Sequence, residues 1–253
     1  MNKISFHTKL MSMLGIHFCI FLYAVSNYWQ LNVFLICLLI SRLLGIIGNE
    51  VAMHRLWTHK SFKTSKWVEF ILHIISTPLM HGSSIVYAGI HRQHHAYADT
   101  EKDPHIKPWY KTVFYIRNKN YQIENKYIVD LLKDPWHKWT HKNYFTVNSI
   151  LLVVCLVIFG PIITGYTLSL MIVLNFTITG LINTIGHAPN LGFRNFNTKD
   201  GSSNNHLLHL ITWNGLHNNH HSDPGSWTYS KNKWEIDLPA YIILLIKNDS
   251  KSK

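Results

Sequence analysis

Long apolar blocks alternate with polar stretches along this chain of 253 residues. A helix needs about 20 mostly apolar residues to cross a bilayer, and four blocks come close to that length. We predict transmembrane helices at about residues 12–27, 31–53, 145–161 and 165–187. The uncharged stretch SNYWQLN joins the first pair, and FGPIITG breaks the second pair at Gly160, as a turn would. The pattern predicts an all-α integral membrane protein whose four transmembrane helices form two hairpins, in one domain over residues 1–253.

The segment between about residues 67 and 90 is largely apolar but is interrupted by Glu69, Pro78 and Gly82. It is too short to cross a bilayer twice, because two crossings need about 40 residues. A single crossing would put the histidine-rich stretches on either side of it on opposite faces of the membrane. We therefore predict an interfacial or buried segment that does not span.

Charge sets the expected orientation. The chain has 24 Lys and Arg against 13 Asp and Glu, and nearly all of the basic residues lie outside the two short hairpin loops. Because basic residues gather on the cytoplasmic side of membrane proteins, we expect both termini, residues 54–144 and residues 188–253 to be cytoplasmic. Nucleic acid is not an expected partner, since no binding module accompanies the basic residues. We expect a multi-pass protein of a bacterial inner membrane.

Eight of the 18 histidines fall into three clusters, HRLWTH from His54, HRQHH from His91 and HNNHH from His217. Neutral imidazole is the commonest side-chain metal ligand. In HxxHH on a helix, all three histidines lie near one face, so each such triad can converge on a metal. His54 and His59 do not share a face of an α-helix, so this pair fits a helix end or serves two different metals. Eight ligands are too many for one zinc, and two metals with four or five ligands each fit better.

Other residues receive a structural interpretation. The three cysteines lie in apolar segments and form no CxxC pair, so they predict small buried side chains. Isolated histidines are usually surface or core residues, and this interpretation applies to His7, His17, His73, His105, His137 and His141. His206 and His209 stay open, because they lie just before the third cluster. The HExxH motif that is typical of zinc metalloproteases is absent from the sequence.

The three clusters resemble the histidine boxes of the membrane fatty acid desaturases, in particular the acyl-CoA delta-9 (stearoyl-CoA desaturase-like) type. HRLWTHKSFK, HRQHHAYADTEKDPH and HNNHH resemble the three boxes, and NTIGH resembles an additional Asn-x-x-x-His motif. RNFNTKDGSSNN and KWEIDL resemble the segments around the third box. The similarity runs from about residue 30 to 240.

The resemblance implies a di-iron centre on a cytosolic, histidine-rich helical cap, and no catalytic residue beyond the metal ligands. The implied ligands are His54, His59, His91, His94, His95, His187, His217, His220, His221 and, through a water, Asn183. The implied reaction uses O₂ and two electrons to place a cis double bond in a saturated acyl chain carried by CoA or a lipid. That chemistry belongs to the cofactor, while the protein fixes which carbon faces the metal. Tyr87, Thr179 and His81 match positions that line the substrate tunnel.

The chain departs from the family pattern before the third box. WNGL stands where many relatives have GEGW, so Asn214 replaces an acidic residue and Leu216 an aromatic one. His206 also stands where an aromatic residue is expected. No heme or ferredoxin motif is visible, so we expect a separate cytochrome b5-like or ferredoxin-like electron donor that docks on the basic face. Two alternatives remain open at this stage, a di-iron hydroxylase of hydrocarbons, sterols or carotenoids and a membrane metal carrier.

Overall fold

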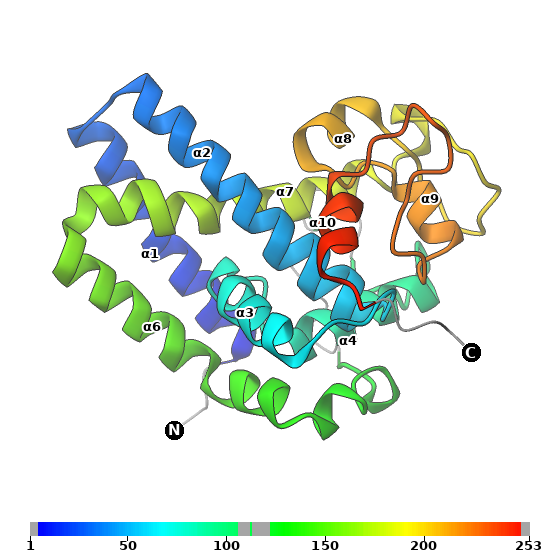
Figure 1. The fold of residues 1–253 in the computed structure, drawn as a ribbon, viewed down its shortest axis with the longest axis horizontal. Coiled ribbons are helices and arrows are strands. Elements are labelled where there is room, and N and C mark those ends of the chain that lie inside the picture. The colour runs from blue at the N-terminus through cyan, green and yellow to red at the C-terminus, as the bar shows by residue number, and fades with distance from the viewer. Residues whose placement is uncertain (1–4, 106–111, 113–121, 249–253) are drawn as a thin grey trace.

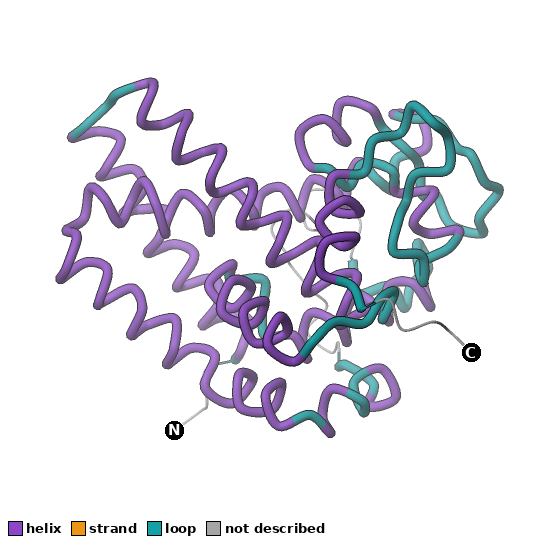
Figure 2. The backbone as a smooth tube through the Cα atoms, in the orientation of Figure 1, coloured by secondary structure: helices purple, strands orange, loops and turns teal. Residues whose placement is uncertain are grey.

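The computed structural model describes residues 5–105, 112 and 122–248, and these residues fold into helices and loops without a strand. Four long helical stretches occupy one side of the molecule in Figure 1, and the loops gather on the other side, as Figure 2 shows. Isolated bridges pair Phe193 and Leu216 with Asn204, and Thr64 with Lys247. The expected all-α architecture is confirmed.

The first two long helices are α1 (Phe6–Asn27) and α2 (Leu31–Gly45). Ser5 caps α1 by accepting a hydrogen bond from the backbone N–H of Thr8. Helix α2 continues without a break into the π-helix η1 (Ile46–Thr58). The helix therefore runs past the predicted end at residue 53 and carries His54 within its last turns.

The second long pair is α6 (Pro135–Thr164) and α7 (Leu170–Ile185), joined by the π-helical turn η5 (Gly165–Ser169). Asp134 caps α6, and a proline at its first position suits a helix start. Gly160 has φ 73° and ψ 172°, so the backbone breaks where the sequence predicts a turn. Figure 1 shows α6 and α7 running in different directions from this bend.

Three described helices are long and apolar enough to cross a membrane: Phe6–Asn27, Leu31–Thr58 and Pro135–Ile185. The third has 51 residues, about 76 Å of helix at 1.5 Å per residue, which is more than twice the bilayer core of about 30 Å. A fourth candidate arises if α3 (Lys66–Ser76) with η2 (Thr77–Leu79) and α4 (Ser84–Tyr97) count as one span bent by 80°. The division into four spans and two hairpins therefore stays a prediction.

Apolar side chains cover the outside of the long helices. Ile36 and Leu39 on α2 and Val157 on α6 are more than half exposed, as expected for residues that face lipid. Between the helices, α1 packs on η5 and α6, and α2 packs on α7. The interior is apolar there, with Leu14, Tyr144 and Ile172 buried in one cluster.

Short elements complete the other side of the molecule. They are η3 (Asn125–Tyr127), η4 (Leu131–Lys133), η6 (Pro189–Leu191), α8 (His206–Thr212), α9 (His217–Ser222) and α10 (Leu238–Ile246). Two arginines, the buried Arg55 and the partly buried Arg92, link elements on this side through ion pairs. Arg55 donates to both carboxylate oxygens of Asp237 at 2.8 and 2.9 Å, and Arg92 does the same with Asp130 at 2.7 and 3.0 Å. Bidentate pairs of this kind fix geometry as well as contribute energy.

Candidate metal centre

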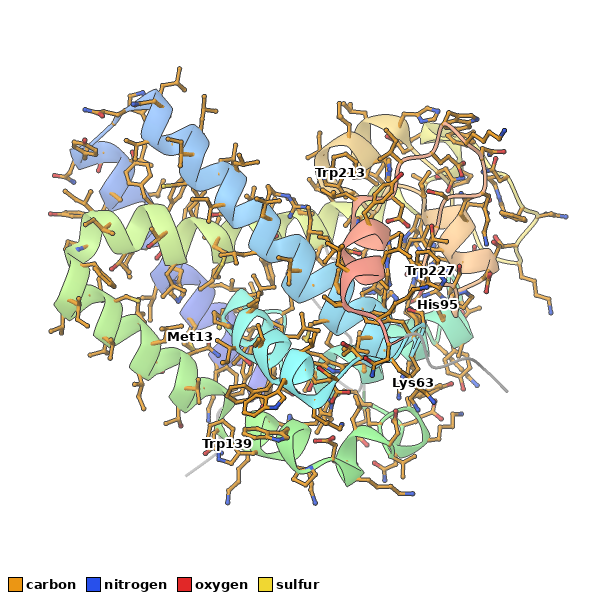
Figure 3. All side chains as sticks on the ribbon, viewed as in Figure 1. Met13, Lys63, His95, Trp139, Trp213 and Trp227 are labelled. Atoms are coloured by element: carbon orange, nitrogen blue, oxygen red, sulfur yellow. The ribbon has the colours of Figure 1, made fainter. Side chains whose placement is uncertain are left out.

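The nine predicted histidines come together in two compact groups, although they arise from four separate parts of the chain. In each group one nitrogen per imidazole lies within 4.8 Å of all the others, which is close enough to share a metal ion. The five-histidine group contains His54, His59, His91, His95 and His220. The four-histidine group contains His94, His187, His217 and His221. Figure 3 labels His95 on the loop-rich side of the molecule, where α4 and α9 lie.

The two HxxHH motifs divide between the groups in opposite senses. On α4, His91 and His95 belong to the five-histidine group and His94 to the other. On α9, His217 and His221 belong to the four-histidine group, whereas His220 belongs to the five-histidine group. The expectation that each triad converges on one metal is therefore wrong. Residues i and i+4 differ by about 40° around an α-helix, but i+3 points about 100° away from i+4.

His54 and His59 both belong to the five-histidine group, so they do not serve two different groups. The reason is the π-helical backbone of η1. The N–H of His59 donates to the carbonyl of His54 at 3.0 Å, an i→i+5 bond that widens the turn. Their ring centroids are 5.0 Å apart as a result. The other interpretation of the pair, a helix end, agrees with the structure because η1 ends at Thr58.

Carboxylates hold four of the nine rings by their Nδ1 atoms. His54 Nδ1 donates to Glu50 at 3.2 Å, in the five-histidine group. In the four-histidine group, the corresponding bonds are His94 to Asp103 at 2.9 Å, His187 to Asp99 at 3.0 Å and His221 to Asp200 at 2.9 Å. A carboxylate only accepts hydrogen bonds, so each Nδ1 carries the proton and each Nε2 presents a lone pair. This is the usual arrangement around metal-binding imidazoles.

The donor geometry fits a metal in each group. His54 Nε2 lies 2.8 Å from His91 Nε2 and 3.1 Å from His220 Nε2, and His94 Nε2 lies 3.0 Å from His187 Nε2. Lone pairs that face each other at this distance repel unless a cation lies between them. Metal–nitrogen bonds of about 2.1 Å at right angles would separate two nitrogens by about 3.0 Å. The Nε2 atoms of His59 and His221 are also buried without a hydrogen-bond partner among the described residues.

Burial keeps the imidazoles of the third box neutral. Desolvation, aided by the neighbouring imidazoles, lowers the pKa of His217, His220 and His221 well below the ordinary value of 6.5. Neutral imidazole is the form that binds metal, so these three histidines are in the ligating form at neutral pH.

A cavity adjoins both groups. His54, His91 and His217 line it, together with the amide side chains of Asn49, Asn183 and Asn214 and the tunnel candidates Tyr87, Thr179 and His81. His81 Nε2 and Thr179 Oγ1 are hydrogen-bonded at 3.1 Å across the cavity wall, and both side chains are buried. Tyr87 stacks on His91, with 5.9 Å between ring centroids. Three of the nine predicted histidines, together with Asn183 and the three tunnel candidates, thus line one cavity.

Comparison with known proteins identifies the chain. The family described as Fatty acid desaturase matches residues 16–233. The chain is 33% identical over 215 residues to an sn-2 palmitoyl-lipid 9-desaturase of Nostoc sp. (strain 36), which covers 81% of this chain and 75% of the relative. It is 30% identical over 244 residues to an acyl-CoA C20 Delta5-desaturase of Anemone leveillei, covering 92% and 76%. It is 28% identical to an sn-1 stearoyl-lipid 9-desaturase of Anabaena variabilis, covering 92% and 88%.

The chain belongs to the fatty acid desaturase family. It is therefore an oxidoreductase of the desaturase type, and the carrier alternative loses its support. The relatives differ in the position of the double bond and in the group that carries the acyl chain, as their names state. Membership in the family alone does not determine either property for this desaturase.

The remaining histidines of the desaturase have mostly structural contacts. His17 bonds Ser169, His137 bonds Ser84 and His141 bonds Ser83, and His73 stacks on Trp57. His206 stacks between Phe193 and Trp234, as the expected aromatic residue would, and His209 contacts the carbonyl of Ile236. His105 differs from its structural interpretation, because it lines the cavity with its ring centroid 4.6 Å from that of His94.

Sequence reasoning missed the four carboxylates. Glu50 had a usable signal, since it lies four residues before His54 and so on the same helix face. Asp99 and Asp103 lie in the acidic stretch after the second box, but their separate partners on different elements could not be deduced from it. Asp200 lies in RNFNTKDGSSNN, 21 residues before His221, and the fold brings the two side chains together.

Proposed function

We propose that the two histidine groups bind two iron ions, with five protein ligands at one and four at the other. The support is the Nε2 geometry of both groups together with membership in the desaturase family. Asn183 lines the cavity one helical turn before His187, and we assign it a water that completes the four-histidine group. Imidazole also suits zinc, copper and nickel, so the assignment of iron rests on the family.

The proposed reaction removes one hydrogen from each of two adjacent methylene carbons of a saturated acyl chain. O₂, two electrons and two protons are consumed, and a cis double bond and two waters are formed. Bound iron with O₂ supplies an oxidant for C–H bonds that are not acidic. The residues of the chain bind the acyl group, exclude water and hold the carbons in place.

The cavity residues would set which carbons react. We propose that the acyl chain passes His81, Thr179 and Tyr87, which belong to different elements, and that the hydrogen bond between His81 and Thr179 shapes its bend. The ring of Tyr87 lies against His91, so the substrate must pass next to the five-histidine group. Because both side chains are buried, the loss of either His81 or Thr179 would leave the other without this hydrogen-bond partner.

We propose a Δ9 product formed on acyl-CoA or an acyl-lipid. Two of the relatives described above are named 9-desaturases of lipid-linked chains, and the third acts on an acyl-CoA at Δ5 according to its name. Apolar helices long enough to span suit a substrate drawn from the bilayer. The electrons would come from a separate cytochrome b5-like or ferredoxin-like protein.

The proposed placement is a bacterial inner membrane, with four spans in two hairpins and the metal centre on the cytoplasmic side. It is supported by the basic residues outside the hairpin loops and by the backbone break at Gly160. In this arrangement α3, η2 and α4 do not span, and both termini are cytoplasmic.

Fatty-acid analysis of a host without its own desaturase tests the function. We expect membranes from cells that express the chain to contain a new cis-monounsaturated acid, whose mass spectrum places the double bond at Δ9. His220→Ala is the control, because it removes one ligand of the five-histidine group, and it should give no product. His81→Leu should give a different chain-length or positional distribution with both irons retained.

Three results would count against the proposal. A hydroxylated acid in place of the unsaturated one would favour the hydroxylase alternative. A product that persists in the His220→Ala variant would remove the metal centre from the reaction. A double bond at another position would leave the desaturase assignment intact and reject Δ9.

A further inference from the structure

The two histidine groups differ sharply in the charge placed directly behind their ligands. Three of the four imidazoles in the four-histidine group donate to a carboxylate, namely Asp103, Asp99 or Asp200. In the five-histidine group, Glu50 behind His54 is the one carboxylate bonded to an imidazole among the described residues. The ligand counts differ by one, but the bonded negative charges differ by two.

Neighbouring cations do not cancel this difference. Arg55 follows His54 in the chain, and its guanidinium lies 3.9 Å from the ring centroid of Tyr229, which packs against His220. Arg92 follows His91. Both arginines lie on the side of the five-histidine group, and Asp237 and Asp130 already neutralise them. Among the described residues, the ion pairs of Asp103 and Asp200 are those with His94 and His221.

The three aspartates are also fixed in position. Asp99 has φ 62°, a left-handed conformation that aspartate tolerates, and its Oδ2 also accepts the N–H of Gly201. Asp103 accepts the N–H groups of Asp99 and His105 at 2.8 Å each. Asp200 accepts the N–H of Ser202 at 2.9 Å. These backbone bonds hold the three carboxylates in place beside the imidazoles.

We infer that the four-histidine group is the tighter of the two metal positions, and that Asp99, Asp103 and Asp200 make it so. The inference rests on the proposal that both groups bind metal. A carboxylate on Nδ1 makes an imidazole a better donor, and removing such a partner typically lowers metal affinity about 10- to 100-fold. Two additional carboxylates therefore outweigh one additional neutral imidazole, whose place a water held by Asn183 can take.

Cobalt(II) titration of the metal-free, full-length protein against a competing chelator tests the inference. We expect two binding steps of different affinity. Asp200→Asn should weaken the tighter step about 10- to 100-fold and leave the looser one in place. Glu50→Gln is the matched control, because it makes the same carboxylate-to-amide change behind His54, and it should weaken only the looser step.

A second measurement does not depend on how the variants fold. Protein that carries one equivalent of cobalt should show anomalous scattering at the four-histidine group and little at the other. Equal occupancy, a single affinity for both equivalents, or loss of the tighter step in Glu50→Gln would overturn the inference while the proposed di-metal function survives. If no cobalt binds at all, the inference and the proposed metal centre both fail.

Discussion

Each aspartate behind the four-histidine group joins one of its imidazoles to the backbone of a loop. Asp99 bonds both His187 and the N–H of Gly201, and Asp200 bonds both His221 and the N–H of Ser202. The carboxylates that orient these two imidazoles therefore also bond the backbone of residues 201 and 202. Substitution of either aspartate is expected to affect metal affinity and loop order together.

Asn214 and His217 provide a test at a position where the chain departs from the family. Asn214 Oδ1 and His217 Nδ1 are both buried without a hydrogen-bond partner among the described residues, and both residues line the cavity. His217 is also the one member of the four-histidine group without a carboxylate on its Nδ1. We expect Asn214→Asp to slow cobalt release to a chelator by about 10-fold, whereas Asn214→Ala should not slow it. Faster release from Asn214→Asp would show that this side chain does not act on His217.

The sequence predicts which histidines belong to the site but not which side chains they contact. The nine histidines and Asn183 were identified by their spacing and by resemblance, and the structure brings all nine histidines into two groups. The assignment of each histidine to a group was not predictable, because it depends on the angle at which α4 and α9 face each other. Three of the four carboxylate partners were missed for a different reason. They lie in loops, and the hydrophobic pattern does not determine the path of a loop.

At the scale of elements, the π-helix η1 shows how a local change of backbone geometry makes a site. A regular α-helix would turn His59 away from His54. The wider i→i+5 turn brings them together at the cost of poorer backbone hydrogen bonding. The sequence predicts a helix over residues 31–53 correctly, but hydrophobic periodicity does not reveal the π-helical continuation to Thr58.

The contact between α1 and η5 depends on a small residue. A Cβ added at Gly165 would lie 2.3 Å from the Cβ of Ala24 and 2.9 Å from the carbonyl oxygen of Ile20. Close approach of two helices at small residues is a common way to pack within a membrane. We expect Gly165→Ala to destabilise the protein by about 1–3 kcal/mol, measured as a lower thermal transition in detergent. Gly15→Ala on α1 is the control, because nothing lies within 4 Å of the added Cβ; equal behaviour of the two variants would contradict the packing argument.

Glu235 gives the segment around α9 a pH dependence. Burial raises the pKa of this carboxyl, but the N–H groups of Lys231 and Asn232 and the amide of Asn195 lower it more, and the pKa ends below its ordinary value of 4.5. The stabilisation is therefore present above about pH 4.5 and is lost as the pH falls through the lowered pKa. Glu235 also accepts the side-chain N–H of Asn219, which lies between two ligands on α9.

Hydrogen exchange of residues 217–237 measures this effect. After correction for the intrinsic pH dependence of exchange, protection of the wild-type segment should fall as the pH drops below 4.5. Glu235→Gln should have lower protection at neutral pH and respond less to acid. An identical response of the two proteins to acid would assign the pH dependence to another group.

At the scale of the whole molecule, the orientation in the membrane is the main open prediction. Asn125 follows the α3–α4 segment, whereas Trp29 and Ile163 lie near the two proposed hairpin turns. In a chain whose native cysteines are replaced, Trp29→Cys and Ile163→Cys should react with an impermeant thiol reagent on intact cells. Asn125→Cys should react only after permeabilisation. Labelling of Asn125→Cys from outside would mean that α3 and α4 form one bent span.

The long apolar blocks predict the all-helical architecture well, because a bilayer leaves little choice but helices for segments of this length. They do not predict the number of spans, because Pro135–Ile185 is a single long helical stretch with a break in the backbone at Gly160. The polar side is predicted least well. Its path is set by contacts between distant residues, such as the bidentate pair of Arg55 with Asp237.

The division of the histidines between two groups also sets the order in which the groups become complete during synthesis. Chains are made from the N-terminus and begin to fold during synthesis. Four of the five histidines of one group are present once residue 95 has been made, and the fifth is His220. The other group has only His94 until His187 appears, and it is complete only at His221. A chain that ends before α9 would thus contain four of the five histidines of one group and two of the four of the other, so neither group is complete without the third cluster.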